Sequence, residues 1–126
     1  MTDVTIVSFG YLHGAPPPAH ITLDLRHHFR DPHVSPELRY MTAADELVQQ
    51  AVLGTPGVTD LVAAVADAVA AFAYGPRAGP VTVADGCAGG RHRAPVFAQA
   101  LADQLTAAGH TVAVQHRDLH RPVVNR

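Results

Sequence analysis

Short apolar runs alternate with longer amphipathic stretches along the chain. Val4–Phe9 (VTIVSF) and Ile21–Leu25 (ITLDL) are rich in β-branched residues and predict two buried strands, separated by a loop rich in glycine and proline. Pro80–Ala84 (PVTVA) predicts a third strand and Thr111–Val114 a fourth. A helical pattern separates these last two strands, so the carboxyl-terminal half is predicted to be a right-handed, parallel βαβ unit.

Two helices are expected between the second and third strands. The first should run from Thr42 to Leu53, with Thr42 as its N-cap, Asp45 in the capping-box position and Gly54 as its stop signal. The second should cover Val58–Tyr74, where apolar residues recur on one face at a spacing near 3.6 residues, namely Val58, Leu61, Val62, Val65, Val69 and Phe72. Such a stripe is typical of a helix face buried in a core.

A third helix is expected after the strand at Pro80–Ala84. It should begin near Pro95, a residue that a first helical turn tolerates, and end at Gly109. The order of elements predicts an α/β fold in which helices flank a mostly parallel four-stranded sheet. The 126 residues fit one domain, residues 1–126, which is long enough to bury a core without disulfides or a structural metal.

Composition narrows the function classes. Cys87 is the single cysteine, so no disulfide can form within the chain, and a reducing cytoplasmic setting is expected. No apolar run approaches the ~20 residues that span a bilayer, and no signal-peptide pattern precedes the first strand, so the prediction is a soluble protein with no membrane partner. The formal net charge of −2 excludes a global basic field for nucleic-acid binding.

The segment Gly86–Ala94 (GCAGGRHRA) concentrates the candidate chemistry. It follows a predicted strand and precedes a predicted helix, the context in which glycine-rich loops bind phosphates. Gly86, Gly89 and Gly90 would let backbone N–H groups turn toward an anion, and the helix N-terminus would add roughly half a positive charge. With the arginines and histidine of the same segment, the sequence predicts an anion site.

Cys87 to Arg93 also matches C-x-x-G-x-x-R and so resembles the phosphate loop of cysteine-dependent phosphatases. A thiolate at a helix N-terminus beside arginines would be activated by a lowered pKa, and Asp31 could serve as the general acid. Two positions depart from that pattern, because Ala94 replaces the usual Ser or Thr and Gly86 replaces the usual histidine. A phosphatase therefore remains the alternative to a binding module.

A metal site is the less favoured interpretation of the histidines. His27, His28 and His33 could combine with Asp24 or Asp31, but their spacing matches no specific zinc pattern. The prediction is therefore no metal and no cofactor.

A second resemblance covers nearly the whole chain. Val7–Arg39 (VSFGYLHGAPPPAHITLDLRHHFRDPHVSPELR) and Asp85–Leu119 (DGCAGGRHRAPVFAQALADQLTAAGHTVAVQHRDL) follow the order of motifs in the RapZ C-terminal domain family. These motifs are S-F-G-[FY], D-[VL]-R, N-P-[HY], P-x-L-R, G-C-T-G-G-x-H-R-S and a final H-R. The chain therefore resembles this family of RNase adapter proteins, which were formerly named nucleotide-binding proteins.

The resemblance implies a fold similar to part of a phosphofructokinase, self-association into a homo-oligomer, and binding of glucosamine 6-phosphate or a related nucleotide sugar without catalysis. Small-RNA binding in an adapter role is implied as well. Carried over by motif, the ligand site would comprise Cys87, Ala88, Gly89, Gly90, His92, Arg93, Asp24, Arg26, Asp31 and His33.

This chain departs from the family pattern in four ways. Asp31 stands in place of the usual Asn, and Ala88 and Ala94 stand in place of two hydroxyl residues. No G-x-x-x-x-G-K-[ST] motif is present, which predicts a stand-alone C-terminal module without nucleotide hydrolysis. The family's lysine-rich RNA-binding end is represented by His116, Arg117, Arg121 and Arg126 with no lysine, and a solvated tail is the favoured interpretation.

Overall fold

The computed structural model describes residues 2–77 and 79–125, which form one α/β domain. Its sheet has four strands, β1 (Val4–Gly10), β2 (Ile21–Asp24), β3 (Val81–Cys87) and β4 (Val112–His116). They lie in the order β2-β3-β1-β4, and every pair is parallel. The predicted fold class is confirmed.

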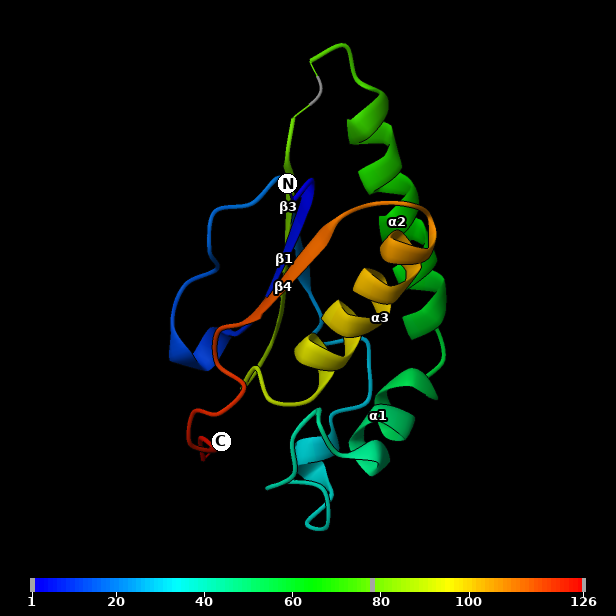
Figure 1. Cartoon of the computed structure of the whole chain (residues 1–126). Coiled ribbons are helices and arrows are strands. Elements are labelled where there is room, and N and C mark those ends of the chain that lie inside the picture. The colour runs from blue at the N-terminus through cyan, green and yellow to red at the C-terminus, as the bar shows by residue number, and fades with distance from the viewer. Residues whose placement is uncertain (1, 78, 126) are drawn as a thin grey trace.

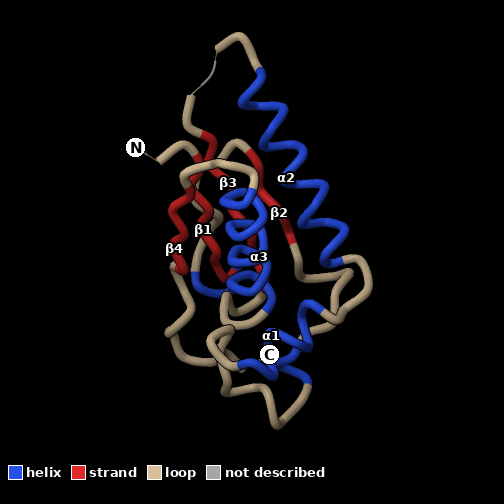
Figure 2. The backbone as a smooth tube through the Cα atoms, turned by 45° about the vertical axis from the view of Figure 1, so that its right-hand side comes forward, coloured by secondary structure: helices blue, strands red, loops and turns tan. Residues whose placement is uncertain are grey.

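Three α-helices, α1 (Glu46–Leu53), α2 (Val58–Tyr74) and α3 (Arg93–Ala107), lie on one side of the sheet (Figures 1 and 2). α2 and α3 pack on the sheet, whereas α1 packs against these two helices beyond the carboxyl edge of the sheet. The crossovers from β2 to β3 and from β3 to β4 step along the sheet in the same direction, so right-handed connections place their helices on the same side. The step from β1 to β2 runs in the opposite direction. Its connection, 11–20, therefore lies over the other face (Figure 1).

The core lies between the sheet and the helix layer. Alternate residues of β1 and β3 point into it, as expected from the two-residue period of a strand. Its buried side chains include Val4, Ile6, Val81 and Val83 from the strands, Val62, Val65 and Val69 from α2, and Phe97, Leu101 and Leu105 from α3. The stripe predicted for the second helix is therefore core except at its end, where Phe72 is exposed.

The first helix begins later than predicted. One of the two hydrogen bonds of the expected capping box forms, because the Asp45 carboxylate accepts from the Thr42 N–H, but the Thr42 hydroxyl accepts from the Ala44 N–H instead of that of Asp45. They close an isolated turn, since Asp45 itself has extended backbone angles and interrupts the helical path. Asp45 is consequently the N-cap of α1.

Three strand predictions also need correction. β2 was expected to be buried, but it lies at the edge of the sheet and its alternate residues Thr22 and Asp24 are exposed. β3 continues three residues beyond the predicted end, because Asp85, Gly86 and Cys87 stay paired with β1. β4 runs to His116 rather than ending at Val114.

Among the described residues, no single helix combines the length and the apolar character needed to cross a membrane. Only α1 and α2 taken together meet that test, as a pair bent by 79° at the break between them.

Candidate functional site

The predicted site residues converge at the carboxyl edge of the sheet. β1 and β3 end side by side, with Gly10 opposite Cys87, and the loop 88–92 leads from β3 into α3. In open parallel sheets this edge is where ligands bind. Two further segments reach the same place, namely the connection after β2 and the chain that follows β4.

Two glycines of the loop have different roles. Gly90 has φ +71°, and a Cβ there would come within 2.7 Å of the Gly10 nitrogen, so the backbones of the loop and β1 approach closely only because both residues are glycine. Gly89 faces open space, since an added Cβ would meet nothing within 4 Å. Gly89 is thus the position at which a ligand can come nearest to the backbone.

Gly86 does not belong to the loop, which corrects the sequence prediction. It lies within β3, where its carbonyl accepts from the Leu25 N–H, and a Cβ would come within 2.4 Å of the Phe9 ring. A glycine is therefore required at this position by packing against β1, and Gly86 supplies no N–H to the predicted anion site.

The loop leaves backbone donors unused. None of the hydrogen bonds formed within the described residues uses the N–H of Gly89, Arg91 or His92. These groups immediately precede α3, whose N-terminus carries partial positive charge. Unused N–H groups at a helix start are the arrangement that binds anions in other proteins.

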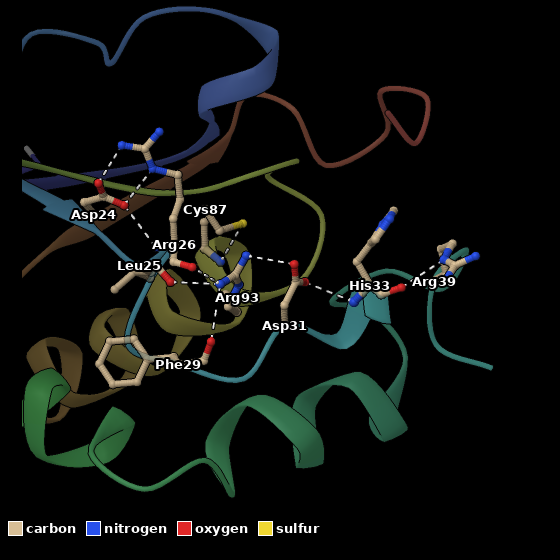
Figure 3. Close-up of polar contacts among 10 residues, drawn as sticks. Asp24, Leu25, Arg26, Phe29, Asp31, His33, Arg39, Cys87 and Arg93 are labelled. Carbon is tan, nitrogen blue, oxygen red and sulfur yellow. Dashed lines mark hydrogen bonds and ion pairs between the residues drawn. The ribbon is translucent and has the colours of Figure 1, made fainter. Parts of the chain in front are cut away.

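Arg93 is buried inside the protein rather than open to a ligand. Its side chain is 3% exposed, and Nη1 donates to the carbonyl oxygens of Leu25, Arg26 and Phe29 at 3.1, 2.9 and 3.4 Å. Nη2 lies 3.2 Å from Oδ2 of Asp31 (Figure 3). Its Nε is buried without an acceptor among the described residues. Arg93 therefore fixes the chain that follows β2 against the start of α3.

Asp31 and His33 are held in the same network. The Asp31 carboxylate accepts from the His33 N–H at the start of a short 3-10 turn, Pro32–Val34, while it pairs with Arg93. The His33 carbonyl accepts from Nε of Arg39 (Figure 3). The negative charge that Asp31 brings to the site is thus balanced by Arg93.

Asp24 and Arg26 pair with each other at the surface. Two hydrogen bonds join their side chains at 2.9 and 2.7 Å, and the Arg26 guanidinium stacks 3.8 Å from the centre of the Tyr11 ring. The hydrogen bonds from Arg26 lower the pKa of Asp24 to about 2. Figure 3 places this pair apart from Asp31 and His33, with Arg93 between them.

Cys87 is unsuited to nucleophilic attack. It is 2% exposed, and burial raises the pKa of its thiol, although the N–H of Ala94 at 3.4 Å and the nearby Arg93 charge act in the opposite direction. The expected activation by the helix and the arginines is therefore wrong. A buried, protonated thiol gives no support to the phosphatase alternative.

Arg91 and His92 tie the loop to the segment before α1. Arg91 donates to the carbonyl oxygens of Tyr40 and Met41, and Nε2 of His92 lies 2.8 Å from the Met41 carbonyl. Burial lowers the pKa of His92, which favours the neutral imidazole. Both side chains therefore shape the loop, while their backbone N–H groups stay unused.

These groups surround a small cavity of about 20 Å³. The predicted residues that line it are Cys87, Gly89, His92, Arg93, Asp31 and His33, joined by Leu12, Arg91 and the C-terminal residues Pro122, Val123 and Val124. Ala88, Gly90, Asp24 and Arg26 are not among the lining residues. A cavity of this size holds about one water molecule.

The segment after β4 is only in part the solvated tail that the sequence favoured, because His120 and Arg121 are exposed but the residues before them are fixed to the domain. The carboxylate of Asp118 is buried and accepts from the Gly10 N–H at 2.8 Å and from Arg117 at 3.0 Å. Arg117 also donates to the carbonyl oxygens of Gly10, Gly14 and Ala15. The sequence analysis missed Asp118, and the only sequence signal was an acidic residue directly after the H-R motif.

The three proposed RNA-binding residues differ in availability. The His116 ring is held 2.7 Å from the Ser8 hydroxyl, and the donors of Arg117 are taken up within the domain. Arg121 remains 58% exposed while it pairs with Asp118. Arg126 lies outside the described residues. Across residues 2–77 and 79–125, no group of three His, Cys, Asp or Glu side chains is placed to hold a metal ion.

Comparisons with known proteins agree with the motif order. Residues 2–120 match the family described as the RapZ C-terminal domain. The chain is 44% identical over 121 residues to a nucleotide-binding protein of Salinispora tropica, covering 94% of this chain and 40% of the relative. Nucleotide-binding proteins of Streptomyces coelicolor and Desulforudis audaxviator are 38% and 35% identical, covering 93% and 95% of this chain and 40% and 42% of those relatives. The chain thus spans about two fifths of the length of these relatives.

Proposed function

The chain belongs to the family of RapZ C-terminal domains, and from this membership we propose that it binds a phosphorylated small molecule at the carboxyl edge of its sheet, without catalysis. The proposed ligand class is an amino-sugar phosphate, with glucosamine 6-phosphate as the first candidate, or a nucleotide sugar. The relatives named as nucleotide-binding proteins support a ligand that carries phosphate.

The observation that carries this proposal is the set of unused backbone donors at Gly89, Arg91 and His92. They lie at the N-terminus of a helix that runs from Arg93 to Ala107, so the helix dipole and the N–H groups favour an anion at the same point. Gly89 has no Cβ that would obstruct the approach of the anion. In the proposed complex, the phosphate oxygens accept from these N–H groups.

The other residues proposed from the sequence have supporting roles. Arg93 and Asp31 hold the segment after β2 beside the loop, and His33 lies on the same side of the cavity and could contact the sugar. Arg26 remains 37% exposed and could contact a larger ligand that extends from the cavity. Ala88 and Gly90 would contribute to the loop's shape only.

We propose a binding module rather than an enzyme because the residues of the phosphatase alternative, Cys87 and Asp31, are not available for covalent or acid-base attack on a phosphate. The thiol of Cys87 is buried and its pKa is raised. His92 contacts the Met41 carbonyl, and Asp31 is paired with Arg93. The proposal does not include RNA binding, since the internal contacts of His116 and Arg117 favour a structural role for that end of the domain.

A thermal-shift screen tests the proposal. Glucosamine 6-phosphate, glucose 6-phosphate, UDP-sugars, nucleotides and inorganic phosphate would be added to the purified chain, and released phosphate would be measured in parallel. We expect at least one sugar phosphate or nucleotide sugar to raise the melting temperature with no release of phosphate. A screen in which none of these compounds has an effect would contradict the proposal.

A further inference from the structure

The C-terminal segment forms one wall of the cavity described above. Pro122, Val123 and Val124 line it together with Gly89 and Arg93. The rest of the lining includes the charged or polar side chains of Asp31, His33, Arg91, His92 and Arg93. The cavity has room for about one water molecule, whereas pockets that bind small ligands enclose roughly 300–1,000 Å³. A sugar phosphate therefore cannot enter while this wall is in place.

Few polar contacts among the described residues hold this wall, in which Pro122 is exposed and Val123 and Val124 are half-buried. No hydrogen bond formed within the described residues involves Pro122, Val123 or Val124. The direct polar contact between the loop and this end of the chain is long, at 3.5 Å from Nη1 of Arg91 to the Arg121 carbonyl. Segments with few buried contacts and few hydrogen bonds open locally at low cost in free energy.

The contacts that position this wall are made by Asp118 and Arg121, which precede it in the chain. The buried carboxylate of Asp118 accepts from the Gly10 N–H at the end of β1, and Nε of Arg121 lies 3.2 Å from the other oxygen, Oδ1. Arg117 pairs with the same carboxylate at 2.9 Å. These contacts connect the last residue before the wall to the edge of the sheet.

We propose that Asp118 is a positioning residue: its ion pair with Arg121 holds Pro122–Val124 in place as a movable wall over the ligand site. We call this ion pair the latch. Opening of this latch admits the phosphorylated ligand. The proposal rests on the proposed function for the identity of the ligand, but the movement of the wall is a property of the chain alone.

Cys87 reports this movement without any ligand. It is the single cysteine of the chain, it lines the cavity, and it is 2% exposed while the wall is closed. The rate at which an uncharged maleimide modifies the native protein therefore measures how often the cavity opens. Free energies of unfolding by urea, measured on the same samples, separate this local opening from global unfolding.

Arg121→Ala should raise the labelling rate about 1.5- to 5-fold, the range expected for loss of an exposed ion pair, with an unchanged urea midpoint. Arg121→Lys should restore the parent rate in part. Asp118→Asn should raise it by about tenfold or more, because charge-assisted hydrogen bonds to a buried group are lost. Arg77→Ala, an exposed arginine after α2 at the opposite end of the sheet, is the matched control and should label like the parent.

Two outcomes would overturn the proposal. One is an Arg121→Ala labelling rate equal to that of Arg77→Ala. The other is a labelling rate that rises only in proportion to a loss of global stability, because Cys87 would then be reached through unfolding. If Asp118→Asn does not fold, the Arg121 series decides the question. If none of the sugar phosphates and nucleotides of the thermal-shift screen binds the parent, the proposed function fails while the labelling result still stands.

Discussion

Nη2 of Arg93 lies 3.2 Å from Oδ2 of Asp31, in a contact where the arginine is 3% and the aspartate 23% exposed. The arginine that a phosphate-loop pattern would assign to a bound anion is thus already paired with an anion of the protein. Nη1 also satisfies the carbonyl oxygens of Leu25 and Arg26. Arg93 therefore organises the site by joining the segment after β2 to the first turn of α3.

This network predicts that Arg93→Ala weakens binding of glucosamine 6-phosphate more than Arg91→Ala does. Removal of Arg93 leaves Asp31 and buried carbonyl groups uncompensated, so the free energy of unfolding should fall by about 2–3 kcal/mol, below the range for a fully buried pair because Asp31 retains some contact with water. Arg91→Ala removes hydrogen bonds to two carbonyl groups and should cost about 1 kcal/mol. Urea denaturation and calorimetric titration of both variants would test this order. Equal losses of affinity would contradict it.

Cys87→Ser should leave ligand binding nearly intact. The serine oxygen can accept from the Ala94 N–H, as the thiol does now, and the buried side chain donates nothing that a phosphate needs. We expect the dissociation constant for glucosamine 6-phosphate to change by less than about threefold, equivalent to about 0.6 kcal/mol. Turnover of an aryl phosphate by the parent, abolished in Cys87→Ser, would establish the phosphatase instead.

The burial of Asp85 should make the free energy of unfolding depend on pH. Its carboxylate is fully buried on β3, neither oxygen has a partner among the described residues, and burial raises its pKa well above the usual value. The folded state therefore holds a proton that the unfolded state releases near pH 4, so stability falls as the pH rises from there toward the folded pKa. Asp85→Asn removes this dependence and should stabilise the protein at pH 8 by roughly 1 kcal/mol or more.

Urea denaturation at pH 5 and pH 8 measures this effect. The stability advantage of Asp85→Asn over the parent should be larger at pH 8. Asp67→Asn, at an exposed position of α2, is the control and should show no such trend. An advantage that is the same at both pH values would mean that Asp85 does not carry the proton.

The sheet predicts self-association. The helices cover one face, and the other is covered by the connection 11–20 over part of its area, which leaves Thr5, Val7 and Ala113 half-buried. Parallel sheets are usually covered on both faces. Light scattering should therefore detect an oligomer in the parent, and Val7→Lys should shift it toward monomer while Ala63→Lys, on an exposed side of α2, should not. A parent that is monomeric at every accessible concentration would contradict this prediction.

The sequence predicted the arrangement of elements because its apolar periodicity is clear. The stripe of valines in Val58–Tyr74 identified α2 to the residue, and the order strand, glycine loop, helix correctly placed the loop 88–92 between β3 and α3. The end of β3 was missed because Asp85 and Gly86 are poor strand formers in isolation. Pairing with β1 in the folded sheet overrides that local preference.

The directions in which individual side chains point could not be predicted from the sequence. The motif indicated that Cys87 and Arg93 share a site, but burial decides that the thiol is protonated and that the guanidinium faces the chain after β2. The role of Asp118 depends on contact with Gly10, a residue 108 positions away. Such long-range contacts leave no signal in local pattern, so the C-terminal wall of the site could not be anticipated.

The central proposal is that a phosphorylated ligand binds at the unused N–H groups around Gly89 without being hydrolysed. Titration calorimetry of the parent, Gly89→Val and Gly79→Val with glucosamine 6-phosphate tests it most directly. At both glycines an added Cβ meets nothing within 4 Å, so neither change should disturb the fold, but only Gly89 lies at the site.

We predict saturable binding to the parent and to Gly79→Val, at least tenfold weaker binding to Gly89→Val, equivalent to about 1.4 kcal/mol, and no inorganic phosphate released during the titration. Equal affinity of all three proteins, or release of phosphate by the parent, would contradict the account.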